Sequence, residues 1–276
     1  MAAIALALGA SLTWGFADFY GGLRSRTLGT LRTLFYVQLG GLAGIALVVA
    51  VRGKGPTDAG ALLAIPAAFS GTLGLFAFYR GMAVGAMSIV APIAGVSAVV
   101  PLIVGIASGD RPSTWQLAGM ACALAGVFLT SREPGRGKSR VAAGVGLALL
   151  AAIGFGGYFP PMHAAGNADY WWAALIFRIT SSSVILTAVV VRRPSLSVRP
   201  LQVPSLALVG IGDTLGNLFY AAASSTGLVS VTSVLASLYP IMTIVLARMV
   251  LAERVARSQE AGIGLTLAGV ALISAG

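Results

Sequence analysis

A carboxylic acid, an amide, a phenol and a hydroxyl follow one another at helical spacing inside a long apolar stretch of the chain. They are Asp213, Asn217, Tyr220 and Ser224, and their places in the sequence put all four on one face of a helix. Such a stripe could carry a proton or offer a counter-charge to a substrate amine. The alternatives are a buried ion pair between Asp213 and Arg178, or a bond to nearby backbone.

Trp14 and Asp18 share a helical face and form a second candidate set. Asp18 lies within about two turns of Arg24 and Arg26, so a solvated ion pair fits the sequence as well as a place in a cavity. Trp14 stands deeper in its segment than an interfacial residue, which favours contact with a substrate over packing. Tyr79, Tyr158 and Tyr239 could stack on a planar substrate, with ordinary packing as the alternative for each.

Arg178 and three prolines are candidates for structural or gating roles. Arg178 stands about 13 Å into its helix if that helix begins near Asp169, so its charge needs a partner, and Asp213 is one candidate. Pro92, Pro101 and Pro240 stand among small and hydroxyl residues in two apolar segments. Prolines free backbone carbonyls and small residues let helices slide, both useful in a moving gate, although close packing explains them too.

The composition indicates which solvent surrounds these groups. The chain has 276 residues, of which 57% are hydrophobic and only 9% charged, and its mean hydropathy is +0.92. Soluble domains carry about 25% charged residues, so this chain could not cover a water-facing surface. The sequence therefore predicts a membrane protein.

Short polar stretches rich in Pro and Gly divide the chain into segments of the length that a bilayer requires, about 20 apolar residues each. The sequence thus predicts an all-α membrane protein with ten transmembrane helices. Their expected ranges are 3–23, 30–51, 59–80, 86–107, 114–131, 141–162, 170–191, 203–224, 229–251 and 258–275.

The formal charge of +10 is distributed unevenly between the two sets of loops. Under the positive-inside rule the basic set faces the cytoplasm, which predicts a multi-pass protein of the plasma (inner) membrane with both termini external. Nucleic-acid binding is not expected, because no basic face with interleaved aromatics is present. The loops after the odd-numbered helices hold Arg24, Arg26, Arg132, Arg136, Lys138, Arg140, Arg192, Arg193, Arg199, Arg254 and Arg257, and the opposite loops hold Arg52, Lys54 and Arg111.

The chain contains an internal repeat. DRPSTWQLAGMACALAGVFLTS at 110–131 aligns without gaps on ERVARSQEAGIGLTLAGVALIS at 253–274, a separation of 143 residues. This predicts two five-helix halves, at 1–135 and 136–276. Because five is odd, the second half would cross the membrane in the opposite sense, giving an inverted repeat of the kind used in alternating access.

These features resemble the drug/metabolite transporter superfamily and its EamA-type ten-helix exporters. The resemblance runs from WGFADFYGG at 14–22 to LAGVALIS at 267–274. It implies a secondary transporter that exports amino acids or other small metabolites, with a central cavity lined by helices 1, 3, 4, 6, 8 and 9. It implies a small-molecule substrate and a surrounding lipid membrane, with a monomer sufficient for transport. Asp110 in place of Glu253, and prolines that match only loosely between helices 4 and 9, depart from strict symmetry.

Three other classes are weighed against a transporter. An enzyme would need an acid/base, nucleophile or metal constellation, and the sequence has none, so no catalytic residue, metal or cofactor is expected. A channel would favour symmetric subunits, which the internal repeat argues against. A flippase for a lipid-linked intermediate could share the same fold and stays open. The nature of the substrate, the coupling ion and the oligomeric state do not follow from the residues.

Overall fold

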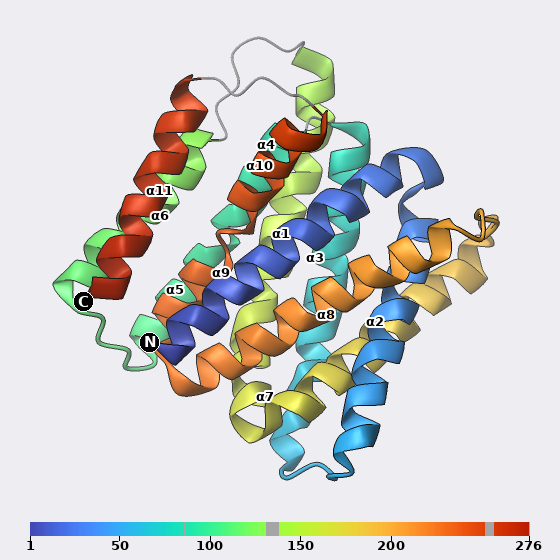
Figure 1. Ribbon diagram of the computed structural model, residues 1–276, viewed down its shortest axis with the longest axis horizontal. Helices are drawn as coiled ribbons and strands as arrows, with labels where there is room; N and C mark the ends of the chain where they lie inside the picture. Colours follow the sequence, from blue (N-terminus) through green and yellow to red (C-terminus); the bar gives the residue numbers. More distant parts are fainter. Residues whose placement is uncertain (86, 131–137, 252–256, 276) are drawn as a thin grey trace.

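The computed structural model describes residues 1–85, 87–130, 138–251 and 257–275, and every regular element in these ranges is helical. Figure 1 shows the helices gathered into one bundle, with the two ends of the chain on the same side. The elements are α1 (Ala2–Leu28), α2 (Thr30–Arg52), η1 (Ala59–Leu63), α3 (Ala64–Val84), α4 (Met87–Gly95), η2 (Val96–Ala98), α5 (Val99–Ala107), α6 (Thr114–Thr130), α7 (Lys138–Arg192), α8 (Gln202–Thr226), α9 (Val229–Ala236), α10 (Tyr239–Leu251) and α11 (Arg257–Ala275).

The long element α7 is two helices joined at Asp169, whose backbone is not helical (φ −165°, ψ 102°). The Oδ1 of Asp169 accepts hydrogen bonds from the backbone N–H groups of Trp171 and Trp172, at 3.0 and 3.2 Å. This is the arrangement of an N-cap, so Asp169 begins the second helix. The sequence predicted a break after residue 162, but Pro160 and Pro161 lie inside the first helix and do not end it.

The prolines proposed as gating residues lie at or beside helix breaks. The three-residue 3₁₀ element η2 separates α4, which contains Pro92, from α5, which contains Pro101. Two residues separate α9 from α10, and Pro240 is the second residue of α10. Proline fits the first turn of a helix because its missing N–H would be unpaired there anyway. Both predicted gating segments are therefore interrupted helices.

Six helical stretches of the described residues are long and apolar enough to cross a membrane. They include Gly144–Arg192, which counts once although it contains the break at Asp169. Two shorter apolar helices, Ile93–Ala107 and Glu260–Ile273, fall below that length. Helical structure is present in each of the ten ranges expected from the sequence. The exact number of crossings stays a prediction.

The packing of the bundle brings together helices that are far apart in the sequence. α1 lies along α8, α3 packs on α7, and α2 contacts both α7 and α8 (Figure 1). α6 and α11 form a close pair at one side of the bundle. The middle of the main bundle is where the candidate side chains meet.

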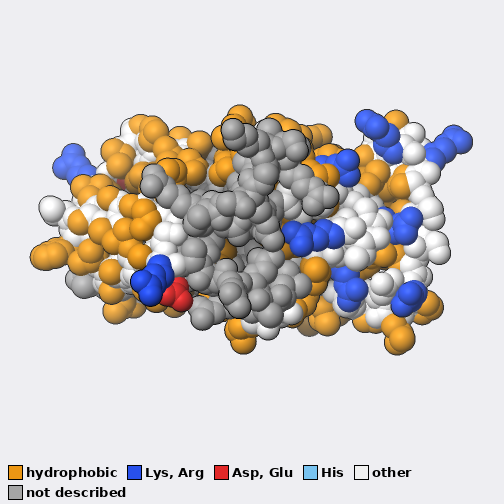
Figure 2. All heavy atoms as spheres, turned by 90° about the horizontal axis from the view of Figure 1, so that it is seen from above, with side chains coloured by type: hydrophobic (Ala, Val, Ile, Leu, Met, Phe, Trp, Pro, Cys, Tyr) orange, Lys and Arg blue, Asp and Glu red, His pale blue; other side chains and the backbone are white. Residues whose placement is uncertain are grey.

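One end of the bundle is rich in basic side chains. Figure 2 looks onto the end where α1 and α3 finish, and Lys and Arg side chains gather over part of it. Arg26, Arg80, Arg192 and Arg193 near the ends of these helices and of α7 are exposed. This is the end that the sequence predicts to face the cytoplasm, and that orientation stays a prediction.

Candidate functional site

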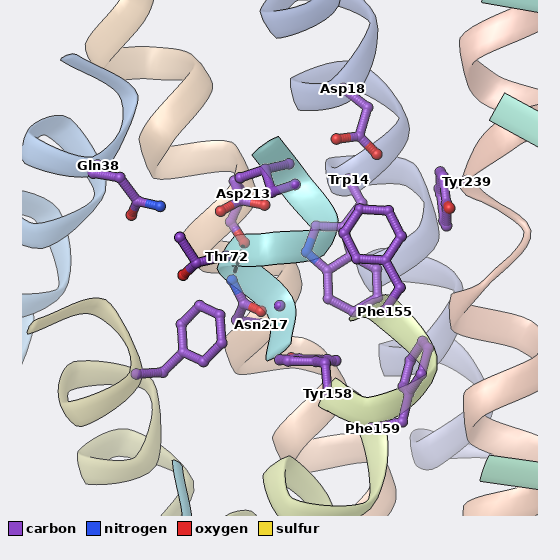
Figure 3. A pocket seen from close by; sticks show the side chains of 13 residues that line it. Trp14, Asp18, Gln38, Thr72, Phe155, Tyr158, Phe159, Asp213, Asn217 and Tyr239 are labelled. Carbon is purple, nitrogen blue, oxygen red and sulfur yellow. Dashed lines mark hydrogen bonds between the residues drawn. The ribbon is translucent and has the colours of Figure 1, made fainter. Parts of the chain in front are cut away.

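A cavity lies among six helices near the middle of the bundle (Figure 3). The space open to the centres of water molecules is about 50 Å³, which is room for a few waters, since one occupies about 10–15 Å³ on this measure. Its lining residues are Trp14, Asp18, Gln38, Gly71, Thr72, Leu75, Phe155, Tyr158, Phe159, Phe177, Asp213, Asn217 and Tyr239. They come from α1, α2, α3, α7, α8 and α10.

Asp213 is held in a buried ion pair. The Nη2 of Arg178 lies 2.6 Å from Oδ2 of Asp213, and the side chain of Arg178 is fully buried. The Nη1 of Arg178 donates to Oε1 of Gln38 at 2.6 Å, and Oγ of Ser181 donates to the same oxygen at 3.0 Å. The pair that the sequence left as an alternative is therefore present, while Asp213 also lines the cavity. Its carboxylate has a dedicated counter-charge.

Asn217 follows Asp213 by one turn on α8 and also lines the cavity. Its Nδ2 donates to the backbone carbonyl of Asp213 at 2.9 Å. That bond fixes the amide against its own helix, which leaves the amide oxygen as an acceptor for another partner. Of the four polar residues predicted to share one helix face, Asp213 and Asn217 therefore line the cavity.

Asp18 is buried on α1, with 4% of its surface exposed, and it lines the same cavity. It makes no hydrogen bond or ion pair with any other residue that the structure describes. The Nε of Arg26 donates instead to the backbone carbonyl of Met82 at 3.0 Å. The solvated ion pair with Arg24 or Arg26, left open from the sequence, is not formed. Burial explains why, because Asp18 faces the cavity and not the aqueous end of its helix.

Aromatic rings form much of the remaining wall. Trp14 meets Tyr158 edge to face, with ring centroids 5.9 Å apart. Tyr239 packs in the same manner against Phe155, at 6.1 Å. Gly216 on α8 permits the approach of Trp14, because a Cβ at that glycine would lie 2.5 Å from the indole Nε1. The rings pack on one another and also border the cavity, so the two readings of these aromatics are compatible.

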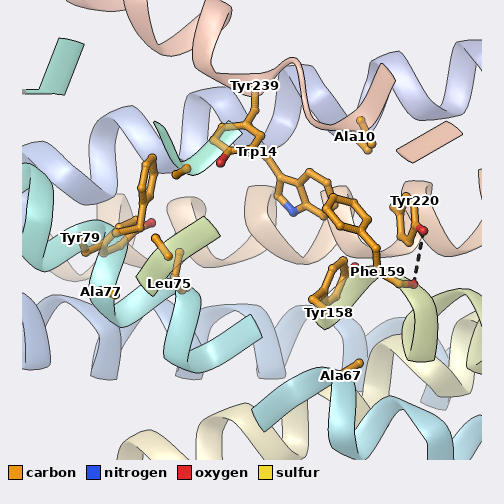
Figure 4. Packing of buried hydrophobic residues seen from close by; sticks show 14 of the residues in the cluster. Ala10, Trp14, Ala67, Leu75, Ala77, Tyr79, Tyr158, Phe159, Tyr220 and Tyr239 are labelled. Atoms are coloured by element: carbon orange, nitrogen blue, oxygen red, sulfur yellow. Dashed lines mark hydrogen bonds between the residues drawn. The ribbon is translucent and has the colours of Figure 1, made fainter. Parts of the chain in front are cut away.

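Two of the candidate tyrosines lie outside the lining. The hydroxyl of Tyr220 lies 3.0 Å from Oγ of Ser233 and 3.3 Å from the carbonyl oxygen of Phe159 (Figure 4). The hydroxyl of Tyr79 donates to the carbonyl of Ala17 at 3.2 Å. Both side chains are fully buried. These phenols tie helices together, while Tyr158 and Tyr239 reach the cavity.

The sequence reasoning missed several lining residues. Gln38 stands alone as a polar group in the apolar run FYVQLGGLAG, so the argument applied to Asp213 would have found it. Thr72 occupies the place of Asp213 in the first half of the chain, by the match of FY at 78–79 with FY at 219–220, but it is less conspicuous in an apolar helix. Phe155, Phe159 and Phe177 carry no sequence signal, because a phenylalanine is equally at home in a core and in a cavity wall.

The comparisons with known proteins concern the whole chain. The model of the EamA-like transporter family matches it twice, over residues 1–132 and 142–275. A solved structure described only as the crystal structure of a protein is 18% identical and superposes with a TM-score of 0.71, over 99% of this chain and 96% of the other. That likeness concerns the fold alone. No curated protein sequence matches the chain significantly.

Proposed function

The chain belongs to the EamA-like transporter family, whose members are membrane transporters and not enzymes, and from this we propose a specific mode of action. The protein is a secondary transporter of the plasma membrane that exports a small metabolite, such as an amino acid or an amphipathic compound, by alternating access. The transport can be coupled to protons through the cavity carboxylates. The observation that carries the proposal is a buried cavity, mostly apolar in its lining, that is bordered by residues of both halves of the chain and by two carboxylates, Asp18 and Asp213.

The packing of α6 against α11 supports an inverted repeat. The 143-residue separation pairs Gly119 with Gly262 and Gly126 with Gly269 as equivalent positions. A Cβ at Gly119 would lie 2.6 Å from the carbonyl oxygen of Gly269, and one at Gly126 would lie 2.6 Å from that of Gly262. Each glycine thus approaches the equivalent of the other.

Such reciprocal contact is what a two-fold axis produces between equivalent surfaces. Gly119 lies against Gly269 and Gly126 against Gly262, so α6 and α11 run antiparallel. A two-fold axis that relates two antiparallel helices is perpendicular to both. The hydroxyl of Thr266, which approaches the carbonyl of its own equivalent Ala123 at 3.5 Å, marks the crossing point. An axis perpendicular to membrane-spanning helices lies in the membrane plane, as an inverted repeat requires.

A second pair of contacts follows the same symmetry. In the repeat, α1 is equivalent to the first part of α7, and α3 is equivalent to α8. α3 packs on α7 where Oγ of Ser70 donates to the carbonyl of Gly154 at 2.8 Å. α1 packs on α8 where Trp14 meets Gly216. The cavity lies between these two equivalent helix pairs. If the two pairs exchanged conformations, the cavity would open to the other side of the membrane.

The cavity in this arrangement is too small for a metabolite. Sites for small molecules usually have about 300–1,000 Å³ of volume, whereas this one has room for a few waters. A metabolite could enter only after the side chains or helices that line it have moved. The broken helices α4/α5 and α9/α10 are the elements that we propose to move, with Pro92, Pro101 and Pro240 as gating residues.

Accumulation in inverted membrane vesicles tests the proposal. Radiolabelled amino acids and amphipathic amines are offered to vesicles with and without an imposed pH gradient, beside vesicles that lack the protein. We expect protein-dependent accumulation of at least one compound, greater with the gradient. Gradient-independent leakage of many unrelated solutes would indicate a channel and would overturn alternating access.

A further inference from the structure

The cavity contains one acidic group more than its basic partners can neutralise. Asp18 and Asp213 both line it, and Arg178 is engaged by Asp213 through a 2.6 Å ion pair. Among the described residues no second cation contacts either carboxylate. An isolated buried carboxylate is costly, so Asp18 needs either a proton or a cation from outside.

Three hydroxyl groups around the same cavity are buried without a hydrogen-bond partner. They are Oγ1 of Thr72 and the phenol oxygens of Tyr158 and Tyr239. Leaving a buried polar group unsatisfied costs about 1–3 kcal/mol, so three at one place call for an explanation. A ligand that brings hydrogen-bond donors would satisfy them, because each hydroxyl oxygen can accept. The carboxylate of Asp18 is an acceptor as well.

The aromatic wall favours the same type of ligand. The indole of Trp14 and the rings of Phe155 and Tyr239 border the cavity on the side where Asp18 lies (Figure 3). The faces of such rings attract cations that have left water, by about 2 kcal/mol when desolvated. They also offer apolar surface to a hydrocarbon chain. A carboxylate beside aromatic rings and unpaired hydrogen-bond acceptors is suited to an organic cation that carries an apolar group.

We propose that Asp18 is the centre of a binding subsite for a primary ammonium group, carried by a small organic cation. The ammonium ion pairs with Asp18 and donates a further hydrogen to the hydroxyl of Tyr239. Arg178 keeps Asp213 neutralised, and the hydroxyl of Tyr158 is a further polar group of the cavity lining. The proposal rests on the proposed transport function and names the substrate class. It assigns the role of counter-charge to Asp18 and not to Asp213.

The repeat explains why such a subsite exists only once. The equivalent of Asp18 in the second half, by the match of WGF at 14–16 with IGF at 153–155, is Gly157. Neither half therefore needs an acid there to fold. A carboxylate that the fold does not require, that has no partner and that faces a cavity is best explained by a ligand.

Calorimetric binding to the purified full-length protein in detergent tests the subsite. The probes are n-butylammonium, neutral 1-butanol and anionic butyrate, which share one hydrocarbon body. We expect wild type to bind n-butylammonium and neither control. Asp18→Asn should weaken that binding at least about tenfold, since a charge-assisted bond becomes a neutral one. Asp58→Asn, which removes an exposed loop carboxylate at a distance from the cavity, is the matched control and should bind as wild type does.

Tyr239→Phe keeps the carboxylate and the ring and removes one hydroxyl, so it tests the subsite even if Asp18→Asn fails to fold. It should weaken n-butylammonium binding by about threefold to tenfold, the effect of one hydrogen bond. Unchanged binding in both variants would overturn the proposal, as would tighter binding of butyrate than of n-butylammonium. A wild type that binds no n-butylammonium would overturn it too.

The binding measurement is independent of the vesicle assay. Ammonium binding without any accumulation in vesicles would remove the transport proposal and leave the subsite. Accumulation of neutral or anionic solutes without ammonium binding would remove the subsite and leave the transport proposal.

Discussion

At the residue scale, the two cavity carboxylates, Asp18 and Asp213, differ in whether a partner in the protein neutralises them. Arg178 donates to both Asp213 and Gln38, and its side chain is fully buried. Removing one member of a buried ion pair leaves an uncompensated charge, while removing both leaves none. Asp213 is therefore expected to behave first as a structural residue, and Asp18 as the group available to a ligand.

A double-mutant cycle distinguishes these roles. Asp213→Asn should destabilise the protein by about 3–5 kcal/mol, because the guanidinium of Arg178 loses its counter-charge. Combining it with Arg178→Gln should recover part of that loss, with a coupling energy of about 0.5–3 kcal/mol. Unfolding in detergent provides the measurement, and Asp58→Asn should change little. Single and double variants whose effects simply add would show that the pair contributes nothing.

The sequence predicted part of the site through helical spacing, and distance along the helix explains the rest. Asp213, Asn217 and Tyr220 share one face of α8, but Tyr220 lies seven residues beyond Asp213, about 10 Å along the axis. That carries it past the cavity to Ser233, where its hydroxyl is satisfied. Periodicity gives the direction of a side chain and not where the cavity ends. The end of the cavity depends on neighbouring helices.

At the element scale, glycines determine where helices meet. α6 and α11 approach so closely that a Cβ at Gly119 would lie 2.6 Å from the carbonyl oxygen of Gly269. Gly264, on the same helix as Gly269, has no atom of another described helix within 4 Å of where its Cβ would stand. Small residues let membrane helices pack closely, because lipid offers no hydrophobic drive for their association. The two glycines should therefore respond oppositely to the same substitution.

Gly119→Val should destabilise the protein by about 1–3 kcal/mol or more, since the added carbon must push the two helices apart. Gly264→Val should be tolerated, since its side chain meets open space and valine suits a lipid-facing position. The measurement is the fraction of correctly folded protein after extraction, followed by thermal unfolding. Equal stability of the two variants would contradict the close contact between α6 and α11.

The broken helices show what the sequence could predict at this scale. The sequence predicted one helix over each of 86–107 and 229–251, with Pro92, Pro101 and Pro240 as gating candidates, and in the structure both segments are interrupted. The start of the second helix of α7 near residue 170 was predicted, but the first helix was expected to end at residue 162 and instead continues past Pro160 and Pro161. The second helix begins at Asp169 because its side chain accepts hydrogen bonds from the backbone N–H groups of Trp171 and Trp172.

At the scale of the whole molecule, hydropathy alone predicted the segments, while symmetry depends on three-dimensional contacts. Two matches to one family model agree with a duplication. The reciprocal approach of Gly119 and Gly126 to the equivalents of each other supports the proposed inverted orientation of the two copies. The distribution of basic residues predicts on which side of the membrane each loop lies.

The distribution of basic residues leads to a prediction about topology. Arg26, Arg80, Arg192 and Arg193 are exposed near one end of the bundle, the end predicted to be cytoplasmic. A reporter that is active only outside should therefore work after Gly276 and in the loop at Gly55, and one active only in the cytoplasm should work near Gly137. Fusions of both reporter types at all three positions provide the measurement. Reversal at every position would overturn the orientation but not the number of crossings, whereas Gly55 and Gly276 on opposite sides would contradict the eight crossings expected between them.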